Sequence, residues 1–313
     1  MHTRVGYLGP EGTFTHQAAL SAAPKDALLL PLGTVTDVYD GVEEGTLDYG
    51  IVAIESSVEG YVVPSLDALV AARNVVAVDE VFVSIAFDAF VRPDAGDTFS
   101  EIVGHPHGLA QCRNFISQRH VHEVSASSNA AACRDIQAHQ IALGPALCGE
   151  LYSLERLASN VQDFSGARTR FLLITSRDRV LAIPDRQQAY SEADASRLRT
   201  MLAVTPKITG PGVLARISNA CGERDVNMSS LITRPLKALE GKYTFIITVD
   251  AAPWHPELHD VLEGFLHHGD AVKTLGVFPA RGEIDDTVDQ SRIAPLSADS
   301  SSTAVETARA LLW

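Results

Sequence analysis

Apolar and polar positions in the first half of the chain alternate between two kinds of segment. Short apolar runs, typical of buried strands, cover residues 5–8, 49–56, 101–106, 121–127, 140–144 and 171–175, and residues 75–91 hold two more. Between them, helical spacing of apolar positions occurs at residues 13–23, 35–45 and 64–72, and onward from His107, Asn129 and Pro145. This alternation predicts an α/β domain over residues 1–180, with parallel strands and crossover helices.

A different order begins near residue 199. Residues 199–282 predict a strand, a helix, two strands, a helix and a last strand, which is the βαββαβ order of a ferredoxin-like domain. Residues 177–198 are polar and charged, and we place a linker at 181–198. The tail, 283–313, is acidic and rich in serine. It predicts one helix, on which Val305, Ala308, Leu311 and Leu312 share a face.

Composition narrows the class of protein. The 313 residues are 46% hydrophobic, which is enough for one or two ordinary cores. The net charge of −14 gives no sign of the basic face that nucleic-acid-binding proteins present, although an acidic protein can still hold a locally basic site. Apolar runs stay far below the roughly 18 residues of a membrane span, and the N-terminus does not resemble a signal peptide. Four scattered cysteines without a CxxC motif predict reduced thiols in the cytoplasm.

Polar side chains gather at the ends of the predicted strands. After residues 5–8, a glycine turn leads to a helix that Thr13 or Thr15 caps, and its free N–H groups suit an anion such as a carboxylate. Further polar corners hold Glu55, Ser56 and Ser57; His107 and Gln111; Ser128 and Asn129; and Thr169. Because ligands of open α/β sheets bind beyond the strand ends, we expect these corners to converge on one cleft. Each corner alone also fits an ordinary helix cap.

Metal chemistry is not expected from this sequence. His105 with His107, and His120 with His122, form HxH pairs, but no CxxC, HExxH or carboxylate-rich loop accompanies them. We therefore interpret these histidines as solvated or hydrogen-bonded, and we predict no metal site. The absence of a GxSxG motif also disfavours an α/β-hydrolase.

Several motifs in a fixed order resemble those of prephenate dehydratase over about residues 4–280. The first four are "YLGPEGTFT" at Tyr7–Thr15, "IESSVEG" at Ile54–Gly60, the His105-Pro106 pair followed by Gln111-Cys112, and Thr169-Arg170-Phe171. Three more resemble those of a regulatory ACT domain: Pro211–Leu214, Ile232–Pro235 and Leu275–Pro279. The resemblance implies a bilobed catalytic domain like a type II periplasmic binding protein, followed by an ACT domain.

The resemblance also implies an activity. It is the conversion of prephenate to phenylpyruvate in L-phenylalanine biosynthesis, with loss of CO₂ and water and without a cofactor, by a cytoplasmic lyase. By resemblance, the catalytic residues are Thr169, Glu55 and Gln111. The implied substrate-binding residues are Thr13, Ser56, Ser57, His105, Ser128, Asn129, Arg170 and Phe171. An effector, L-phenylalanine or another amino acid, is expected at Gly210, Gly212, Val213, Leu214, Thr233, Arg234 and Pro235. A homodimer or homotetramer is expected, because ACT domains pair side by side.

These roles agree with the chemistry of the side chains. The dianionic substrate needs cations and N–H donors, which Arg170 and the helix starts can supply. Arg170 fits a salt bridge that braces the cleft equally well. The departing ring hydroxyl needs a hydrogen-bond donor, and the resemblance assigns that role to Thr169.

The sequence departs from the family pattern at several positions. Ser56 and Ala167 stand where asparagine is usual, and Gly104 stands where serine is frequent. Ile232 and Thr233 replace a Glu-Ser pair, of which the glutamate is implicated in the response to phenylalanine. Arogenate dehydratase and a catalytically inactive amino-acid sensor of the same fold therefore stay open, as does an ACT domain that only dimerises. A chorismate mutase is not expected, because it would need a separate helical segment of roughly 90 residues.

Overall fold

The computed structural model describes residues 2–183, 198–236, 239, 241–281, 293–299 and 301–312. Most of the predicted linker and the start of the predicted tail lie outside the described residues. The chain divides into two compact units, Met1–Arg281 and Gly282–Trp313, so the predicted boundaries within the first unit stay predictions. Among the helices that are described, none is both long enough and apolar enough to cross a membrane.

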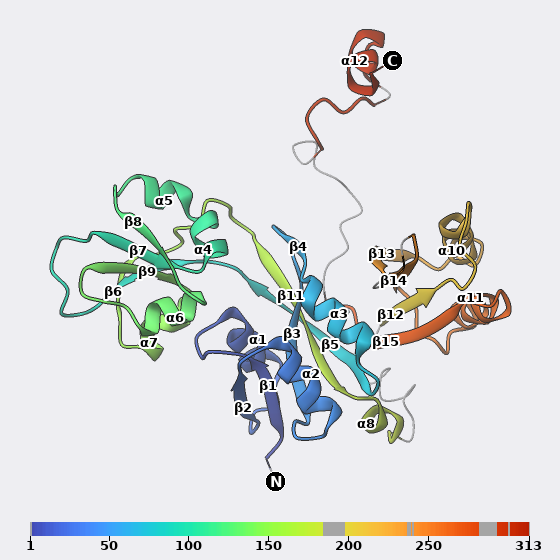
Figure 1. Ribbon diagram of the computed structural model, residues 1–313, viewed down its shortest axis with the longest axis horizontal. Helices are drawn as coiled ribbons and strands as arrows, with labels where there is room; N and C mark the ends of the chain where they lie inside the picture. The colour runs from blue at the N-terminus through green and yellow to red at the C-terminus, as the bar shows by residue number, and fades with distance from the viewer. Residues whose placement is uncertain are drawn as a thin grey trace. The chain divides into compact units, whose positions relative to one another are not determined.

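The first lobe carries the N-terminal elements (Figure 1). In chain order they are β1 (Arg4–Leu8), α1 (Phe14–Ala22), β2 (Leu28–Leu32), α2 (Val35–Glu43), β3 (Tyr49–Ser56), β4 (Gly60–Tyr61), α3 (Val63–Ala71) and β5 (Val75–Ser84). The strand β11 (Arg168–Ser176) returns to this lobe and lies between β5 and β3. A capping box of Thr34 and Asp37 fixes the start of α2, whose Val38, Tyr39 and Val42 are buried.

The second lobe is built around a five-stranded sheet. Its elements are β6 (Asp88–Val91), β7 (Glu101–Gly104), α4 (Pro106–Gln111), α5 (Arg113–Ser117), β8 (His122–Ser125), α6 (Asn129–Arg134), β9 (Gln140–Gly144), α7 (Leu147–Leu151) and β10 (Glu155–Ala158). The chain passes between the lobes at residues 85–87 and 159–167. The N–H of Ile85 donates to the carbonyl of Ala167 at 2.8 Å, so the two crossings are bonded to each other.

The parallel sheets that the alternation predicted are present only in part. β1 is parallel to β2 and β3, and β7 is parallel to β8 and β9. However, β11 is antiparallel to both β3 and β5, and β6 is antiparallel to β9 and β10. For β11 the reason is topological: β5 leads the chain out of the first lobe, and β11 leads it back after the whole second lobe. The strands β2, β4 and β10 were not predicted, and β2 carries Pro31, which an edge strand tolerates.

The ferredoxin-like order is confirmed. After α8 (Arg177–Leu181), which occupies part of the stretch read as polar linker, come β12 (Leu198–Thr205), α10 (Val213–Gly222), β13 (Met228–Pro235), β14 (Tyr243–Val249), α11 (Pro256–His267) and β15 (Ala271–Pro279). The four strands are antiparallel in the order β13-β14-β12-β15. β15 then pairs with β5 through Gly276 and Ala77, so this sheet continues into that of the first lobe.

Two clusters of buried apolar side chains connect the two lobes and the ferredoxin-like domain. One joins the two lobes and includes Tyr7, Ile51, Phe115, Leu143 and Phe171. The other joins the first lobe to the ferredoxin-like domain. It contains Leu66, Leu172, Met201 and Phe278, among others. All four cysteines are buried and free. In the second unit, Thr303 and Glu306 form a capping box that starts α12 (Ala304–Leu311), where the helix was predicted.

Candidate active site

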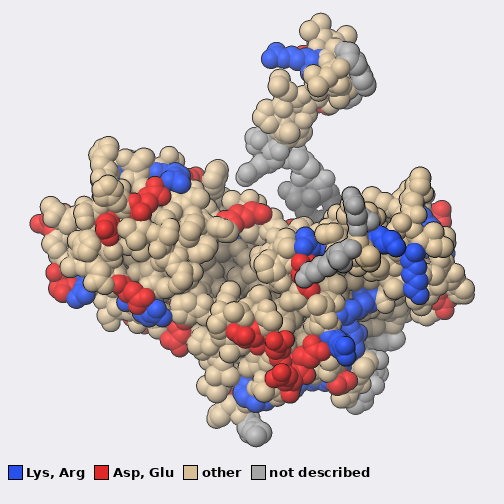
Figure 2. All heavy atoms as spheres, in the orientation of Figure 1, with Lys and Arg blue, Asp and Glu red and all other residues tan. Residues whose placement is uncertain are grey.

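A cavity of about 770 Å³ is formed by residues of both lobes. The first lobe supplies residues around the start of α1 and the turn after β2, and the second supplies His105, Ser127–Ala130, Arg134, Pro145 and Tyr152. Figure 2 shows mostly uncharged atoms on the surface between the lobes. Glu11 and Arg134 are the charged residues among the described residues that line the cavity. Its volume is in the range of small-molecule sites.

The start of α1 offers hydrogen-bond donors to this cavity. Thr13 caps the helix, because its Oγ1 accepts the N–H of His16 at 3.1 Å. The next two residues, Phe14 and Thr15, line the cavity, and at these positions a helix leaves its N–H groups without intrahelical partners. The glycine turn before them is held by His16, whose Nδ1 accepts the N–H of Gly12 at 3.0 Å. Burial lowers the pKa of His16, so its ring remains the neutral acceptor that this bond needs.

His105 and Asn129 meet on the opposite wall. The Oδ1 of Asn129 accepts the N–H of His105 at 2.9 Å and so fixes the start of α4. A side chain at Gly104 would place its Cβ 3.2 Å from this same oxygen, so glycine rather than serine here makes room for Asn129. Partial burial, followed by the charge of His107, lowers the pKa of His105. Ser128 caps α6 by accepting the N–H of Ala131 at 2.9 Å.

A second group of predicted residues lies where β11 enters the first lobe and does not line this cavity. Thr169 pairs with Ser56 across β11 and β3. The N–H of Arg168 donates to the Oγ of Ser57 at 2.9 Å. Gln111, at the end of α4, donates to the carboxylate of Glu59 at 3.2 Å. The helix α4 thus links the two groups, with His105 at its start beside the cavity and Gln111 at its end.

Thr169 and Arg170 point to opposite faces of the sheet. Successive strand residues alternate in direction. Phe171 and Leu173 pack in the cluster between the lobes, and Leu172 and Ile174 pack in the cluster below the ferredoxin-like domain. Thr169 therefore shares the lobe-facing side with Phe171. Arg170 faces the ferredoxin-like domain, with its guanidinium carbon 5.5 Å from the centre of the Phe278 ring.

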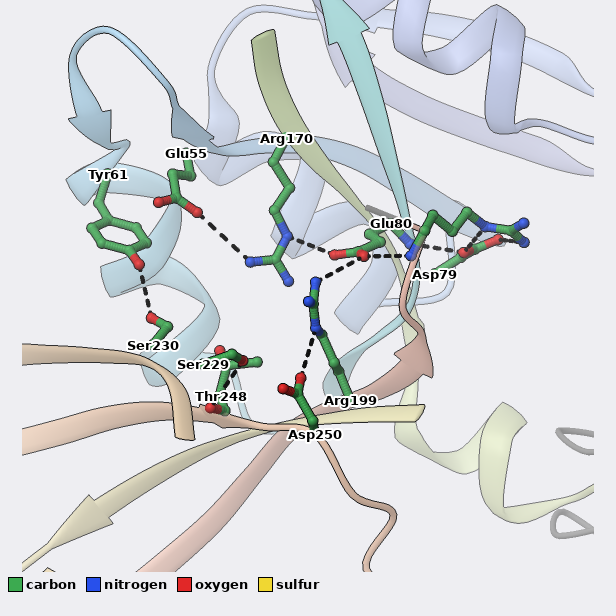
Figure 3. A network of polar contacts seen from close by, with 11 residues as sticks. Glu55, Tyr61, Asp79, Glu80, Arg170, Arg199, Ser229, Ser230, Thr248 and Asp250 are labelled. Carbon is green, nitrogen blue, oxygen red and sulfur yellow. Dashed lines mark hydrogen bonds and ion pairs between the residues drawn. The ribbon is translucent and has the colours of Figure 1, made fainter. Parts of the chain in front are cut away.

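Three of the expected site residues do not line this cavity: Arg170 and Phe171, which were expected to bind substrate, and Glu55, which was expected to be catalytic. Arg170 is a buried brace, because its Nε lies 2.7 Å from Glu80 and its Nη1 lies 3.7 Å from Glu55 (Figure 3). Glu55 sits across from Arg170, since the register of β3 shifts by one residue between Ala53 and Glu55 and turns this carboxylate away from Thr169. Phe171 is only 2% exposed and packs in the core, so it supports the strand rather than lining the cavity.

Some of the expected effector residues line a second hollow, and others do not. Gly210, Gly212, Val213, Leu214 and Thr233 line a hollow of about 520 Å³, together with Ala215, Tyr243 and Phe245. Gly212 begins α10 with a φ of 85°, a conformation that favours glycine. Arg234 and Pro235 do not line this hollow. The guanidinium of Arg234 instead binds Asp67 of α3 in a bidentate pair, at 2.7 and 2.8 Å.

The structure adds residues that the sequence reasoning missed. Arg134, at the end of α6, lines the cavity and forms a bidentate pair with Asp135. Tyr152 lines it too, and its hydroxyl donates to the carbonyl of Glu11 at 2.6 Å. Burial raises the pKa of Tyr152 to about 12, so the hydroxyl keeps its proton. The carboxylate of Glu59 lies 2.6 Å from the Nδ1 of His107 and also accepts the hydrogen bond from Gln111. Of these residues, only Arg134 could have been found from the sequence, because it is the single cation in the helix that begins at Asn129.

Comparisons with known proteins agree with this architecture. The family model "Prephenate dehydratase" matches residues 5–179. A protein of Amycolatopsis methanolica named prephenate dehydratase is 31% identical over 291 residues, which cover 92% of each chain. The crystal structure of a prephenate dehydratase from Arthrobacter aurescens in complex with L-Phe has a TM-score of 0.77 and 30% identity, and the match covers 89% of this chain and 90% of that one.

A third neighbour has a different name. GqqA, described as a novel type of quorum-quenching acylase, is 25% identical with a TM-score of 0.76, and the match covers 88% of this chain and 98% of that one. The family model nevertheless spans more than half of this chain, and the relative with 31% identity spans nearly all of it. With its two lobes, the cavity that they form and the motifs at its walls, this chain belongs to the prephenate dehydratase family.

Proposed function

We propose that this protein converts prephenate to phenylpyruvate, with loss of CO₂ and water, as a lyase of phenylalanine biosynthesis. The observation that carries the proposal is the family match over residues 5–179, because the same residues form both lobes and line the cavity. The buried, free thiols support a place in the cytoplasm. A homodimer or homotetramer stays a prediction.

The cavity matches a substrate with two carboxylates. Arg134 supplies a cation at the second-lobe wall, and the N–H groups at the start of α1 supply donors at the first-lobe wall. Neutral His105, together with Ser128, adds polar contacts that orient the ligand without adding negative charge. We therefore assign to Arg134 the role in anion binding that the resemblance had suggested for Arg170, for which a salt bridge was the equal alternative.

The chemistry needs one well-placed donor. When the carboxylate leaves as CO₂, its bonding electrons move through the ring and expel the hydroxyl group, and the ring becomes aromatic. The hydroxyl leaves more readily as it receives a hydrogen bond or proton. On the family motif we assign this role to Thr169, which lies on the lobe-facing side of β11 but outside the lining of the cavity that holds Arg134. The proposal therefore requires the substrate to reach from this cavity to the end of β11. A threonine hydroxyl is a weak acid, so it acts as a positioned donor. Gln111 and Ser56 lie near the same strand end and hold the surrounding turn.

The test is phenylpyruvate formation from prephenate, read by its absorbance in base. We expect Thr169→Ala to lower kcat by about 10²–10³, the usual cost of one lost donor to the transition state, and Thr169→Ser to keep most of the rate. Equal rates for wild type and Thr169→Ala would refute the assigned role. No turnover by a folded wild-type protein would refute the function and favour an inactive sensor.

The same experiment decides one other activity, and the geometry argues against a second. Arogenate, which carries an amino group where prephenate has a keto group, is run in parallel, and a higher kcat/KM for it would make the protein an arogenate dehydratase. An acylase needs an activated nucleophile. Within the part of the chain that is described, no hydroxyl or thiol of a serine, threonine or cysteine is hydrogen-bonded to a histidine ring. The geometry therefore favours the dehydratase.

We also propose that the ferredoxin-like domain is an ACT domain that binds L-phenylalanine. The hollow at Gly212 and Thr233 supports this, as does the Arthrobacter aurescens relative, whose structure was solved in complex with L-Phe. Titration calorimetry with phenylalanine tests it. We expect binding heat from wild type and none from Gly212→Val, because a β-branched residue at positive φ would displace the start of α10.

A further inference from the structure

Glu80 lies in β5, where β11, the strand that carries Thr169, contacts the ferredoxin-like domain. Its side chain is fully buried, and its two oxygens bind three partners from different parts of the chain (Figure 3). Oε2 receives the Nε of Arg170 at 2.7 Å. Oε1 receives the backbone N–H of Arg281 at 2.8 Å and the Nη1 of Arg199 at 3.4 Å. One carboxylate therefore holds strands β5, β11 and β12 and the residue just beyond β15.

The charges around Glu80 alternate in sign along a chain of contacts. Glu55 meets Arg170, Arg170 meets Glu80, Glu80 meets Arg199, and the Nε of Arg199 meets Asp250 at 2.9 Å. Both arginine side chains are nearly buried, with 10% and 11% of their surface exposed. Buried charges of this kind need a compensating partner, since water is excluded from them. The Nη2 of Arg170 is itself buried without a hydrogen-bond partner, so Arg170 depends strongly on Glu80.

This chain of contacts ends beside the proposed catalytic group. Arg170 directly follows Thr169 in β11, and a strand residue cannot turn without moving the backbone of its neighbour. At the other end, Asp250 and Arg199 belong to the ferredoxin-like domain. Two more contacts join the same surfaces: the hydroxyl of Tyr61 lies 2.7 Å from the Oγ of Ser230, and Arg281 binds Asp79 at 2.7 Å.

We propose that Glu80 is a positioning residue for the dehydratase reaction. It fixes the position of β11 and, with it, the position of the Thr169 hydroxyl on the lobe-facing side. Through Arg199 it also transmits ligand binding at the ferredoxin-like domain to that strand. Glu80 touches no substrate and acts through Arg170. The inference rests on the proposed function, because it takes Thr169 as the donor to the departing hydroxyl.

The first experiment compares Glu80→Gln, which keeps the shape and removes the charge, with wild type in steady-state turnover of prephenate. We expect kcat to fall by about 10², the effect of a displacement of roughly 1 Å at a reacting group, with KM changed by less than about threefold, because the residues that line the cavity are untouched. Lys273→Met is the matched control. It removes another charged contact between β15 and the first lobe, to backbone carbonyls at the end of α3, and should leave kcat within about twofold.

A second variant tests the connection to the ferredoxin-like domain and does not rely on Glu80→Gln folding well. Arg199→Met leaves the pair of Glu80 and Arg170 intact, so we expect a rate close to that of wild type but a loss of its response to phenylalanine. In the double variant Glu80→Gln/Arg199→Met, the loss of kcat should be smaller than in Glu80→Gln alone, because one of the two cations that Glu80 neutralises is gone. Values of kcat and KM for a folded Glu80→Gln within twofold of wild type would overturn the positioning role. An unchanged phenylalanine response in Arg199→Met would overturn the transmission.

Wild-type protein separates this inference from the proposed function. If wild type turns over neither prephenate nor arogenate, the proposed function fails. The role of Glu80 in fixing β11 is then tested by amide hydrogen exchange of residues 168–176. Exchange in this strand should be faster in Glu80→Gln than in wild type and unchanged in Lys273→Met. Equal exchange in all three proteins would refute the role of Glu80 independently of any activity.

Discussion

The single pairing between β15 and β5 makes Gly276 a sensitive position. A Cβ added there would lie 2.6 Å from the Cβ of Ala77, 2.7 Å from its carbonyl oxygen and 3.0 Å from its Cα. Carbon atoms in contact prefer about 3.5–4.0 Å, so the two strands would have to separate by roughly 1 Å. Two of these three atoms belong to the backbone and cannot move aside as a flexible side chain would. Gly276→Ala is therefore expected to lower the free energy of unfolding by about 2–3 kcal/mol, the upper part of the range for overpacking.

Urea unfolding measures this effect. Trp254 and Gly276 line the same hollow of about 230 Å³, so the fluorescence of Trp254 reports on the junction. A Trp313→Phe background removes the second tryptophan signal. The matched control is Gly264→Ala in α11, where an added Cβ has no heavy atom within 4 Å. That change should stabilise the protein by up to about 1 kcal/mol through helix propensity.

A second substitution separates the side-chain contact from the backbone contact. Ala77→Gly removes the Cβ that clashes at 2.6 Å but leaves the carbonyl oxygen at 2.7 Å, so it should rescue Gly276→Ala only in part. An unfolding midpoint of Gly276→Ala equal to that of wild type would refute the close approach of the two strands. A full rescue by Ala77→Gly would show that the side chain alone, and not the backbone, sets the spacing.

Two further predictions concern the turn before α1 and the cavity. Burial keeps the pKa of His16 below its ordinary value of 6.5, so the unfolded state takes up a proton first as the pH falls, and stability is lost from about pH 6.5 downward to the folded pKa. Urea midpoints between about pH 7.5 and 5.5 should therefore fall less in His16→Gln than in wild type, and equal slopes would contradict this. Arg134→Gln should raise KM for prephenate about tenfold with little change in kcat, because a charge-assisted contact to a carboxylate stabilises reactant and transition state alike. An unchanged KM in steady-state kinetics would remove Arg134 from the site.

The order of the elements and the family were readable from the sequence because both depend on local patterns. Apolar runs and helical spacing placed β1, α2, β3 and the ferredoxin-like order correctly, and Thr13 and Ser128 do cap helices. The glycine turn before α1 and the corner at His105 do reach one cavity, as the rule for strand ends predicts. These features follow from residues that are close together in the chain.

Only the tertiary structure decided which face each strand residue occupies and which charges meet. The side of β11 that carries Thr169 depends on the neighbouring clusters, and the shift in β3 that turns Glu55 toward Arg170 has no local signal in the sequence. Glu80 binds Arg170 and Arg199 across 90 and 119 residues, and Arg234 binds Asp67 across 167. A spacing in the sequence fixes periodicity, but the phase of a strand and the partner of a buried charge are set by packing between segments that meet only when the chain folds.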